Sequence, residues 1–381
     1  MIGVFVRRWK LIGLVALGTV ALLIFLAAIF MASGVYNVAA SERHFLVTNK
    51  LLAFTLQRSI ETHSMFVEVP KQNEEDLVPL GANHFSSACA LCHGSPTERR
   101  NAVVLRMLPT PPPLKEAATK WTPAQLFWIV KHGLKYTGMP AWPGAQRDDE
   151  VWAVVAFLRR LPDMDRAEYR RLVRAEPRTE SEERSPLVFE QKEELPHFCS
   201  RCHGTASTLP ASRRVPALHG QSAGYLKRAL EEYRNGTRSS GFMEPVATNL
   251  TAAQIDSLSN EYAERDPIHT APVPKDSRSL KRGRAIAEIG IRESGIPPCL
   301  ACHSGRASKQ FPILRGLSAD YMMGQLSLWR RGLRDETAYG AIMAVIANRL
   351  NQQQIRDVTA YLESLQNKHS ADRPSAGRGG E

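Results

Sequence analysis

The sequence contains few cysteines, and it has none outside one repeated spacing. Only six occur in 381 residues, and all belong to pairs separated by two residues. None is left for a disulfide framework. The chain also lacks a basic helix, a zinc-finger pattern and interleaved aromatic and basic residues, which makes nucleic-acid binding a poor interpretation. With 43% hydrophobic and 23% charged residues, the composition is that of a globular protein with two or three domains.

No block of one charge sign stands out, although the formal net charge is +11. The basic residues are spread along the chain. This pattern is compatible with a solvated basic surface, and equally with attraction to an acidic partner protein or to an anionic bilayer face.

A long apolar run stands near the N-terminus. Residues 11–32 carry no charge, and roughly 20 apolar residues suffice to cross a bilayer. Arg7, Arg8 and Lys10 precede the run, so the positive-inside rule places the N-terminus in the cytoplasm. A cleaved signal peptide is the alternative, but its apolar core usually spans only about 7–15 residues. We therefore predict a retained anchor over residues 1–35.

Two segments in the C-terminal half are internal repeats. Residues 220–238 (GQSAGYLKRALEEYRNGTR) match residues 316–334 (GLSADYMMGQLSLWRRGLR). Each opens with a Ser-Ala pair, at Ser222 and Ser318, that fits a helix start, and each has a glycine, at Gly236 and Gly332, that fits the position past the helix end. A second helix follows in each repeat, with capping boxes expected at residues 251–254 and 351–354.

An earlier segment has the same pattern in looser form. Thr122, Pro123 and Gln125 predict a capped helix through Val130, and residues 151–161 predict a closing helix. The expected fold is all-α, with a transmembrane helix followed by three small helical domains. The predicted boundaries are 1–35 for the anchor, 36–165 for the first domain with an N-terminal extension, 166–184 for a linker, 185–265 for the second domain, 266–276 for a linker, 277–366 for the third domain and 367–381 for a disordered tail.

Each cysteine pair is followed directly by a histidine, at 89–93 (CALCH), 199–203 (CSRCH) and 299–303 (CLACH). Cysteines at this spacing lie on one side of a helical turn, so both sulfurs can form thioethers to one haem while the adjacent imidazole reaches the iron. A zinc site or a redox dithiol is the alternative, but neither requires the following histidine. We predict three covalently bound haem c groups, attached through Cys89, Cys92, Cys199, Cys202, Cys299 and Cys302 and ligated by His93, His203 and His303.

Methionines at repeated positions are candidates for the second axial ligand, which is usually methionine in electron carriers. Met243 and Met343 follow the histidines of their repeats at the same separation, and Met139 precedes Pro140, which keeps it out of a helix. Methionine as core filler is the alternative. We predict Met139, Met243 and Met343 as axial iron ligands, and we assign no catalytic residue.

A Pro-x-Leu segment lies between the histidine and the methionine in each case. Pro112, Pro216 and Pro312 are the prolines. A haem histidine normally donates its other ring N–H to a carbonyl, so we expect these prolines to supply the acceptors. His84 and His132 are the alternatives to test as ligands of the first haem.

These residues resemble class I cytochromes c. The Cys-x-x-Cys-His, Pro-x-Leu, Gly-Gln-Ser-Ala-Gly-Tyr-Leu and methionine segments of residues ~185–365 resemble tandem domains of the cytochrome c4 type. Residues ~80–162, with FWIVKHGLKYTGMPAW, resemble the haem domain of membrane-anchored proteobacterial cytochromes c. Leu317 and Ser304 depart from the c4 pattern, which has Gln and Gly there. The resemblance implies three class I cytochrome c-like domains on the periplasmic side of a bacterial inner membrane, held by a single-pass helix.

The leading functional hypothesis is a pure electron carrier, because irons with two protein ligands leave no open position for a substrate. Its partners would be a quinol-oxidising complex, a dehydrogenase or a terminal oxidase. The second hypothesis is an obligate cytochrome subunit of a membrane-bound dehydrogenase or oxidase. A third, a haem peroxidase, requires an open iron position.

Overall fold

The computed structural model describes residues 2–71, 74–144, 146–173, 194–268, 276–305, 308–315 and 317–365. Most of the linker predicted at 166–184, most of the linker predicted at 266–276 and the whole tail at 367–381 lie outside these ranges. Over the described residues the chain is all-α and contains no strand beyond one isolated bridge between Ile291 and Ile296.

The chain forms two compact units, one of residues 1–56 with 102–110 and the other of residues 57–101 with 111–381. The first contains α1 (Ile2–Ala32) and the short helix η2 (Val104–Arg106). Residues 8–32 of α1 have a mean hydropathy of 2.8 and none of this stretch is buried. By length and composition α1 could serve as a membrane anchor or as a signal sequence. The helix α2 spans Leu46–His63.

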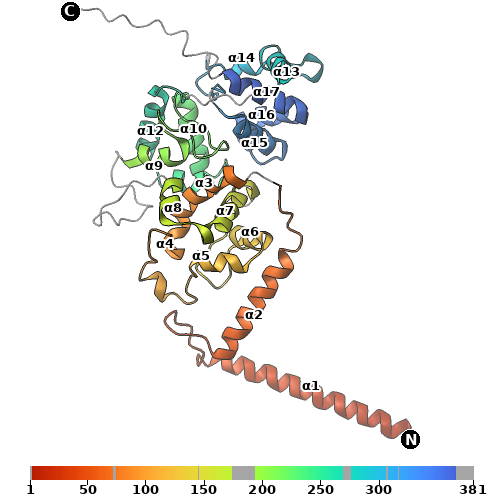
Figure 1. Cartoon of the computed structure of the whole chain (residues 1–381). Helices are drawn as coiled ribbons and strands as arrows, with labels where there is room; N and C mark the ends of the chain where they lie inside the picture. Colours follow the sequence, from red (N-terminus) through yellow and green to blue (C-terminus); the bar gives the residue numbers. More distant parts are fainter. Residues whose placement is uncertain are drawn as a thin grey trace, which may run out of the picture. The chain divides into compact units, whose positions relative to one another are not determined.

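The larger unit contains three consecutive segments, each with one Cys-x-x-Cys-His motif; we call them the first, second and third haem-motif segments (Figure 1). The helices of the first are α3 (Glu74–His84), η1 (Phe85–Cys89), α4 (Ala90–His93), α5 (Leu114–Ala117), η3 (Ala118–Lys120), α6 (Pro123–His132), α7 (Asp148–Arg160), η4 (Leu161–Asp163) and α8 (Arg166–Val173).

The predicted cap of α6 is confirmed, because Thr122 and Gln125 form a capping box in front of it. The closing helix begins three residues before its predicted start, at Asp148. α3 and α7 pack closely, since a Cβ on Gly81 would lie 2.1 Å from the carbonyl oxygen of Ala153. This approach is open only to glycine.

The second and third segments repeat one arrangement, as the sequence indicated. The second contains α9 (Glu194–His203), α10 (Ala223–Arg234), α11 (Met243–Thr248) and α12 (Ala252–Glu264). The third contains α13 (Ser277–Glu288), η6 (Arg292–Ser294), α14 (Cys299–His303), α15 (Ala319–Arg330), α16 (Ala338–Arg349) and α17 (Gln352–Ser364).

The local capping predictions for these repeats hold with one exception. Capping boxes start α12 and α17, and Gly236 and Gly332 adopt φ values of 73° and 66° just past α10 and α15. Ser318 accepts a hydrogen bond from the backbone N–H of Tyr321, as expected. Ser222 occupies the N-cap position of α10 but makes no capping bond; its hydroxyl donates to the carbonyl of Lys309 instead. A hydrogen bond between the second and third segments therefore takes the place of the capping bond expected at the start of α10.

Candidate functional site

Each Cys-x-x-Cys-His motif lies at the C-terminal end of a helix. In the first segment it spans the end of η1 and α4, in the second it forms the last turns of α9, and in the third it is the whole of α14. The helical geometry keeps both cysteines of a pair on one side of a turn. It also places each histidine at the terminus, where the chain turns away from the helix.

The three motif histidines share one hydrogen bond. Nδ1 lies 2.8 Å from the carbonyl oxygen of Pro112 for His93, 2.8 Å from that of Pro216 for His203 and 2.9 Å from that of Pro312 for His303. The predicted proline acceptors are thereby confirmed. A carbonyl only accepts, so Nδ1 carries the proton and Nε2 keeps its lone pair for a metal. Burial favours the neutral form and lowers the pKa of all three imidazoles, and this effect outweighs the hydrogen bond to the proline carbonyl, which raises the pKa.

The predicted residues of the second segment surround one cavity of about 230 Å³. Its lining includes Cys199, Cys202, His203, Leu218 and Met243. Met243 is the first residue of α11. Further apolar lining comes from α10 and α12, so a cysteine pair, an imidazole and a thioether face a largely apolar space. This donor set fits a haem c held by two thioethers and two axial ligands.

In the third segment, Cys299, Leu314 and Met343 pack against one apolar core. Met343 lies inside α16 rather than in a loop, because the chain is helical from Ala338 to Arg349. Its position thus differs from that of Met243, at the start of a helix.

In the first segment, Cys89 and Leu114 also share one core. Met139 is half-buried in a non-helical stretch, as Pro140 predicts. The Met139 carbonyl accepts from Leu134 N–H at 3.2 Å, and the Met139 N–H donates to Thr137 Oγ1 at 3.0 Å. These bonds fix the backbone that presents the thioether.

The two alternative histidines lie in different surroundings. His132 is exposed at the end of α6, with its ring 5.2 Å from that of Trp128. His84 lines the cavity of the second segment rather than a first-segment site, and its ring lies 4.7 Å from Trp142 and 4.9 Å from Phe242. Burial lowers its pKa to about 4. The structure therefore associates His84 with the second cavity.

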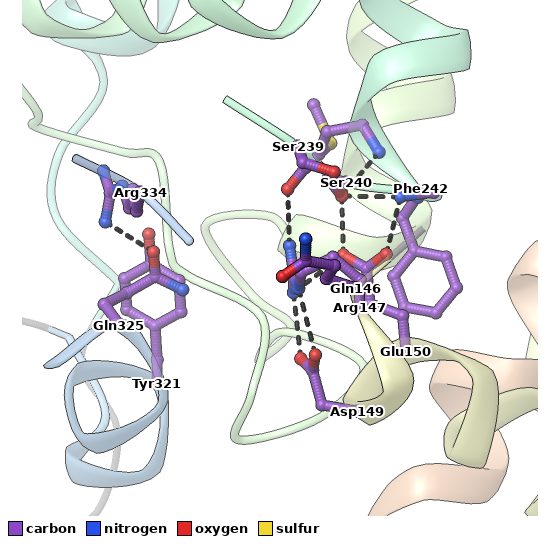
Figure 2. Close-up of polar contacts among 12 residues, drawn as sticks. Gln146, Arg147, Asp149, Glu150, Ser239, Ser240, Phe242, Tyr321, Gln325 and Arg334 are labelled. Carbon is purple, nitrogen blue, oxygen red and sulfur yellow. Dashed lines mark hydrogen bonds and ion pairs between the residues drawn. The ribbon is translucent and has the colours of Figure 1, made fainter. Parts of the chain in front are cut away.

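Two arginines at matching positions of the repeats, Arg238 and Arg334, bear on whether the second cavity suits a haem. Arg238 is only 4% exposed, and its Nη2 lies 3.4 Å from both Tyr321 Oη and Gln325 Oε1. Arg334 bonds to Gln325 Oε1 (Figure 2). Over the described ranges neither guanidinium pairs with a carboxylate. Burial and the charge of Arg238 lower the pKa of Arg334.

Neighbouring buried cations are unfavourable without an anion. A haem brings propionate carboxylates that would neutralise them, so this feature also fits the cofactor. In the sequence these two arginines were only the last residues of the matching repeat segments. That Arg238 is buried and Arg334 half-buried became evident only in the structure.

Comparison with known proteins finds relatives that are cytochromes. The family model for subunit III of cbb3-type cytochrome c oxidase matches residues 77–158. Cytochrome c4 of Pseudomonas aeruginosa is 30% identical over 44% of this chain and 83% of its own length. A thiosulfate dehydrogenase electron acceptor of Stutzerimonas stutzeri is 29% identical over 45% of this chain and 81% of its own length.

A solved structure of cytochrome c4 from Acidithiobacillus ferrooxidans is 32% identical, covering 44% of this chain and 98% of its own, with a TM-score of 0.40. The sequence similarity to cytochromes and the cysteine, histidine and methionine side chains of the site both indicate haem c and electron transfer. The chain belongs to the class I c-type cytochromes, as a relative of cytochrome c4 that binds haem c and transfers electrons without a catalytic role of its own.

Proposed function

We propose that this protein is a membrane-anchored trihaem cytochrome that carries electrons between periplasmic and membrane-bound respiratory partners. The observation that supports it best is the threefold recurrence of one arrangement. Each of three Cys-x-x-Cys-His motifs ends a helix, and each histidine donates Nδ1–H to a proline carbonyl 2.8–2.9 Å away. A single such motif would support one haem, whereas three equivalent ones support three.

In this proposal the six cysteines hold the haems covalently, and His93, His203 and His303 bind the irons through Nε2. Met139, Met243 and Met343 would each supply one iron with its second protein ligand. When bound, haem c supplies an iron that cycles between two oxidation states. The chain orients the imidazoles through the proline carbonyls, excludes water with its apolar cores and leaves no iron position for a substrate.

Haem stoichiometry is the direct test. The full chain, produced in a host that matures c-type cytochromes, should give a pyridine haemochrome equivalent to three haems per polypeptide. Replacing Met139, Met243 or Met343 by alanine, one at a time, should each remove about one third of the methionine-to-iron absorption at the red end of the ferric spectrum. Fewer than three haems, or a methionine variant with the full band, would refute the corresponding assignment.

Membrane attachment through α1 is tested separately. We expect the protein to stay in the membrane pellet after an alkaline carbonate wash and to be released by detergent. A mature N-terminus near Ser41 would show instead that α1 is a cleaved signal sequence. The electron-transfer role would stand in either case, but the anchor would not.

The second candidate is an obligate cytochrome subunit of a dehydrogenase complex. It is favoured by the similarity to the thiosulfate dehydrogenase electron acceptor of S. stutzeri. Gentle detergent extraction followed by affinity purification of the full chain decides between the two. A stoichiometric flavin, quinoprotein or copper subunit favours the subunit role, and isolation as a free cytochrome favours the mobile carrier.

A further inference from the structure

A buried carboxylate of the first haem-motif segment contacts the backbone that leads to Met243 in the second. Glu150 belongs to α7 and is 4% exposed. Its Oε1 accepts a hydrogen bond from Ser240 Oγ at 2.6 Å, and its Oε2 accepts one from the backbone N–H of Gly241 at 2.6 Å (Figure 2). Both oxygens thus accept hydrogen bonds from two consecutive residues, Ser240 and Gly241, that shortly precede the predicted iron ligand.

The contact is continued by Ser240, which is itself buried. Its Oγ accepts from the backbone N–H of Met243 at 3.1 Å and from that of Phe242 at 3.3 Å. A hydroxyl has one hydrogen and two lone pairs. Because the hydrogen is donated to Glu150, the lone pairs are directed at the two N–H groups that begin α11. Glu150 therefore orients the hydroxyl that holds the Met243 backbone.

Two neighbours hold the carboxylate in place. Arg147 Nη2 lies 2.8 Å from Glu150 Oε1, and Arg147 Nη1 donates to the carbonyl of Ser239 at 2.8 Å. Trp142 Nε1 lies 3.4 Å from Glu150 Oε2. A Cβ on Gly241 would come within 2.1 Å of the same indole nitrogen, so the Gly241 backbone lies directly against the Trp142 ring.

We propose that Glu150 is a positioning residue for the proposed iron ligand Met243, so that the first haem-motif segment controls how Met243 would be presented to the second haem. The inference rests on the proposed ligation by Met243. It goes beyond it in assigning the control of that ligand to a carboxylate 93 residues earlier in the chain. A buried carboxylate that accepts from a backbone N–H, a hydroxyl and a guanidinium is a strong, charge-assisted anchor. Its removal would free the backbone that presents the thioether.

The test compares four variants of the haem-loaded full chain. M243A measures the contribution of this ligand to the methionine-to-iron band, which should be about one third of the total. E150A should lose most of the same share and lower the potential of one haem, because methionine ligation raises the potential. E150Q keeps the volume but cannot accept at both positions, so an intermediate loss is expected. S240A interrupts the same chain of bonds without removing a charge, and it decides the matter if E150A does not fold.

Asp357 provides the matched control. It is also a buried carboxylate bonded to an arginine, with Oδ2 2.6 Å from Arg282 Nε, but it lies between α13 and α17 of the third segment. D357N should lower thermal stability while keeping the full band. An unchanged band and unchanged potentials in folded E150A and S240A would overturn the inference, as would an equal band loss in D357N. A full band in M243A would instead overturn the ligand assignment itself.

Discussion

Replacing Gly283 by alanine should destabilise the third haem-motif segment, although alanine is the better helix former. Gly283 is buried in α13, where α17 crosses it. A Cβ at this position would lie 2.0 Å from the carbonyl oxygen of Asp357 and 2.8 Å from Cβ of Tyr361. Since real Cβ contacts essentially never fall below 3.0 Å, the two helices would have to separate by about 1 Å.

The magnitude follows from two opposing effects. Alanine gains about 1 kcal/mol in helix propensity over glycine, while overpacking a core costs about 1–3 kcal/mol. A clash with backbone atoms cannot be relieved by rotating a side chain, so the cost lies at the upper end and the net loss is about 1–2 kcal/mol. For a domain of this size, each kcal/mol lowers the melting temperature by roughly 4–8 °C.

Gly324 is the matched control within the same segment. It lies in α15, is exposed and would have no atom within 4 Å of an added Cβ. The matching position of the second repeat holds Arg228, which shows that a side chain is accommodated there. G324A should therefore raise stability by up to about 1 kcal/mol, through helix propensity alone.

Differential scanning calorimetry of the haem-loaded chain resolves the two signs, because it reports the direction in which the melting temperature shifts. The transition of the third segment should shift down in G283A and up in G324A. A G283A protein that melts at or above the wild-type temperature would refute the close crossing of α13 and α17. Equal destabilisation by both substitutions would show that the effect has nothing to do with that crossing.

Three further predictions concern other parts of the molecule. The pKa of Asp357 lies below its ordinary value, because hydrogen bonds and the charge of Arg282 outweigh the effect of burial. The carboxylate therefore contributes its full stability above the pKa of the unfolded carboxyl, and this contribution is lost as the pH falls through the lowered pKa of the folded state. Melting temperatures measured between about pH 6 and pH 3 should consequently fall less steeply in D357N than in wild type. R238Q removes a buried positive charge that lines the cavity of the second segment. If this cavity holds a haem, as we propose, the substitution should lower one midpoint potential by roughly 60 mV, or about 1.4 kcal/mol for one electron, in a spectroscopic redox titration; unchanged potentials would place this arginine away from the haem. T251A breaks the capping box of α12 and should cost about 1 kcal/mol in chemical denaturation, whereas T251S should remain near wild type.

Much of the candidate site could be predicted because its chemistry is local in the chain. The cysteines and histidine of each motif lie within one helical turn, and the capping boxes at Thr122, Thr251 and Asn351 join residues three apart. The proline acceptors lie only 9 to 19 residues beyond their histidines. Their recurrence in all three segments made the pattern recognisable within this one chain. Covalent haem attachment and the all-α fold therefore followed from residue spacing.

What depended on contacts between segments was decided only by the tertiary structure. Ser222 has the sequence of an N-cap, yet its hydroxyl bonds across to the carbonyl of Lys309. Glu150 is separated from Ser240 by 90 residues, and no periodicity relates a charged residue in one helix to a turn in another segment. The burial of Arg238 likewise requires the packing of neighbouring helices. The spacing of residues along the chain predicts contacts between residues that are close in sequence. The surroundings of a buried charge depend instead on segments distant in sequence that pack against it in the folded protein.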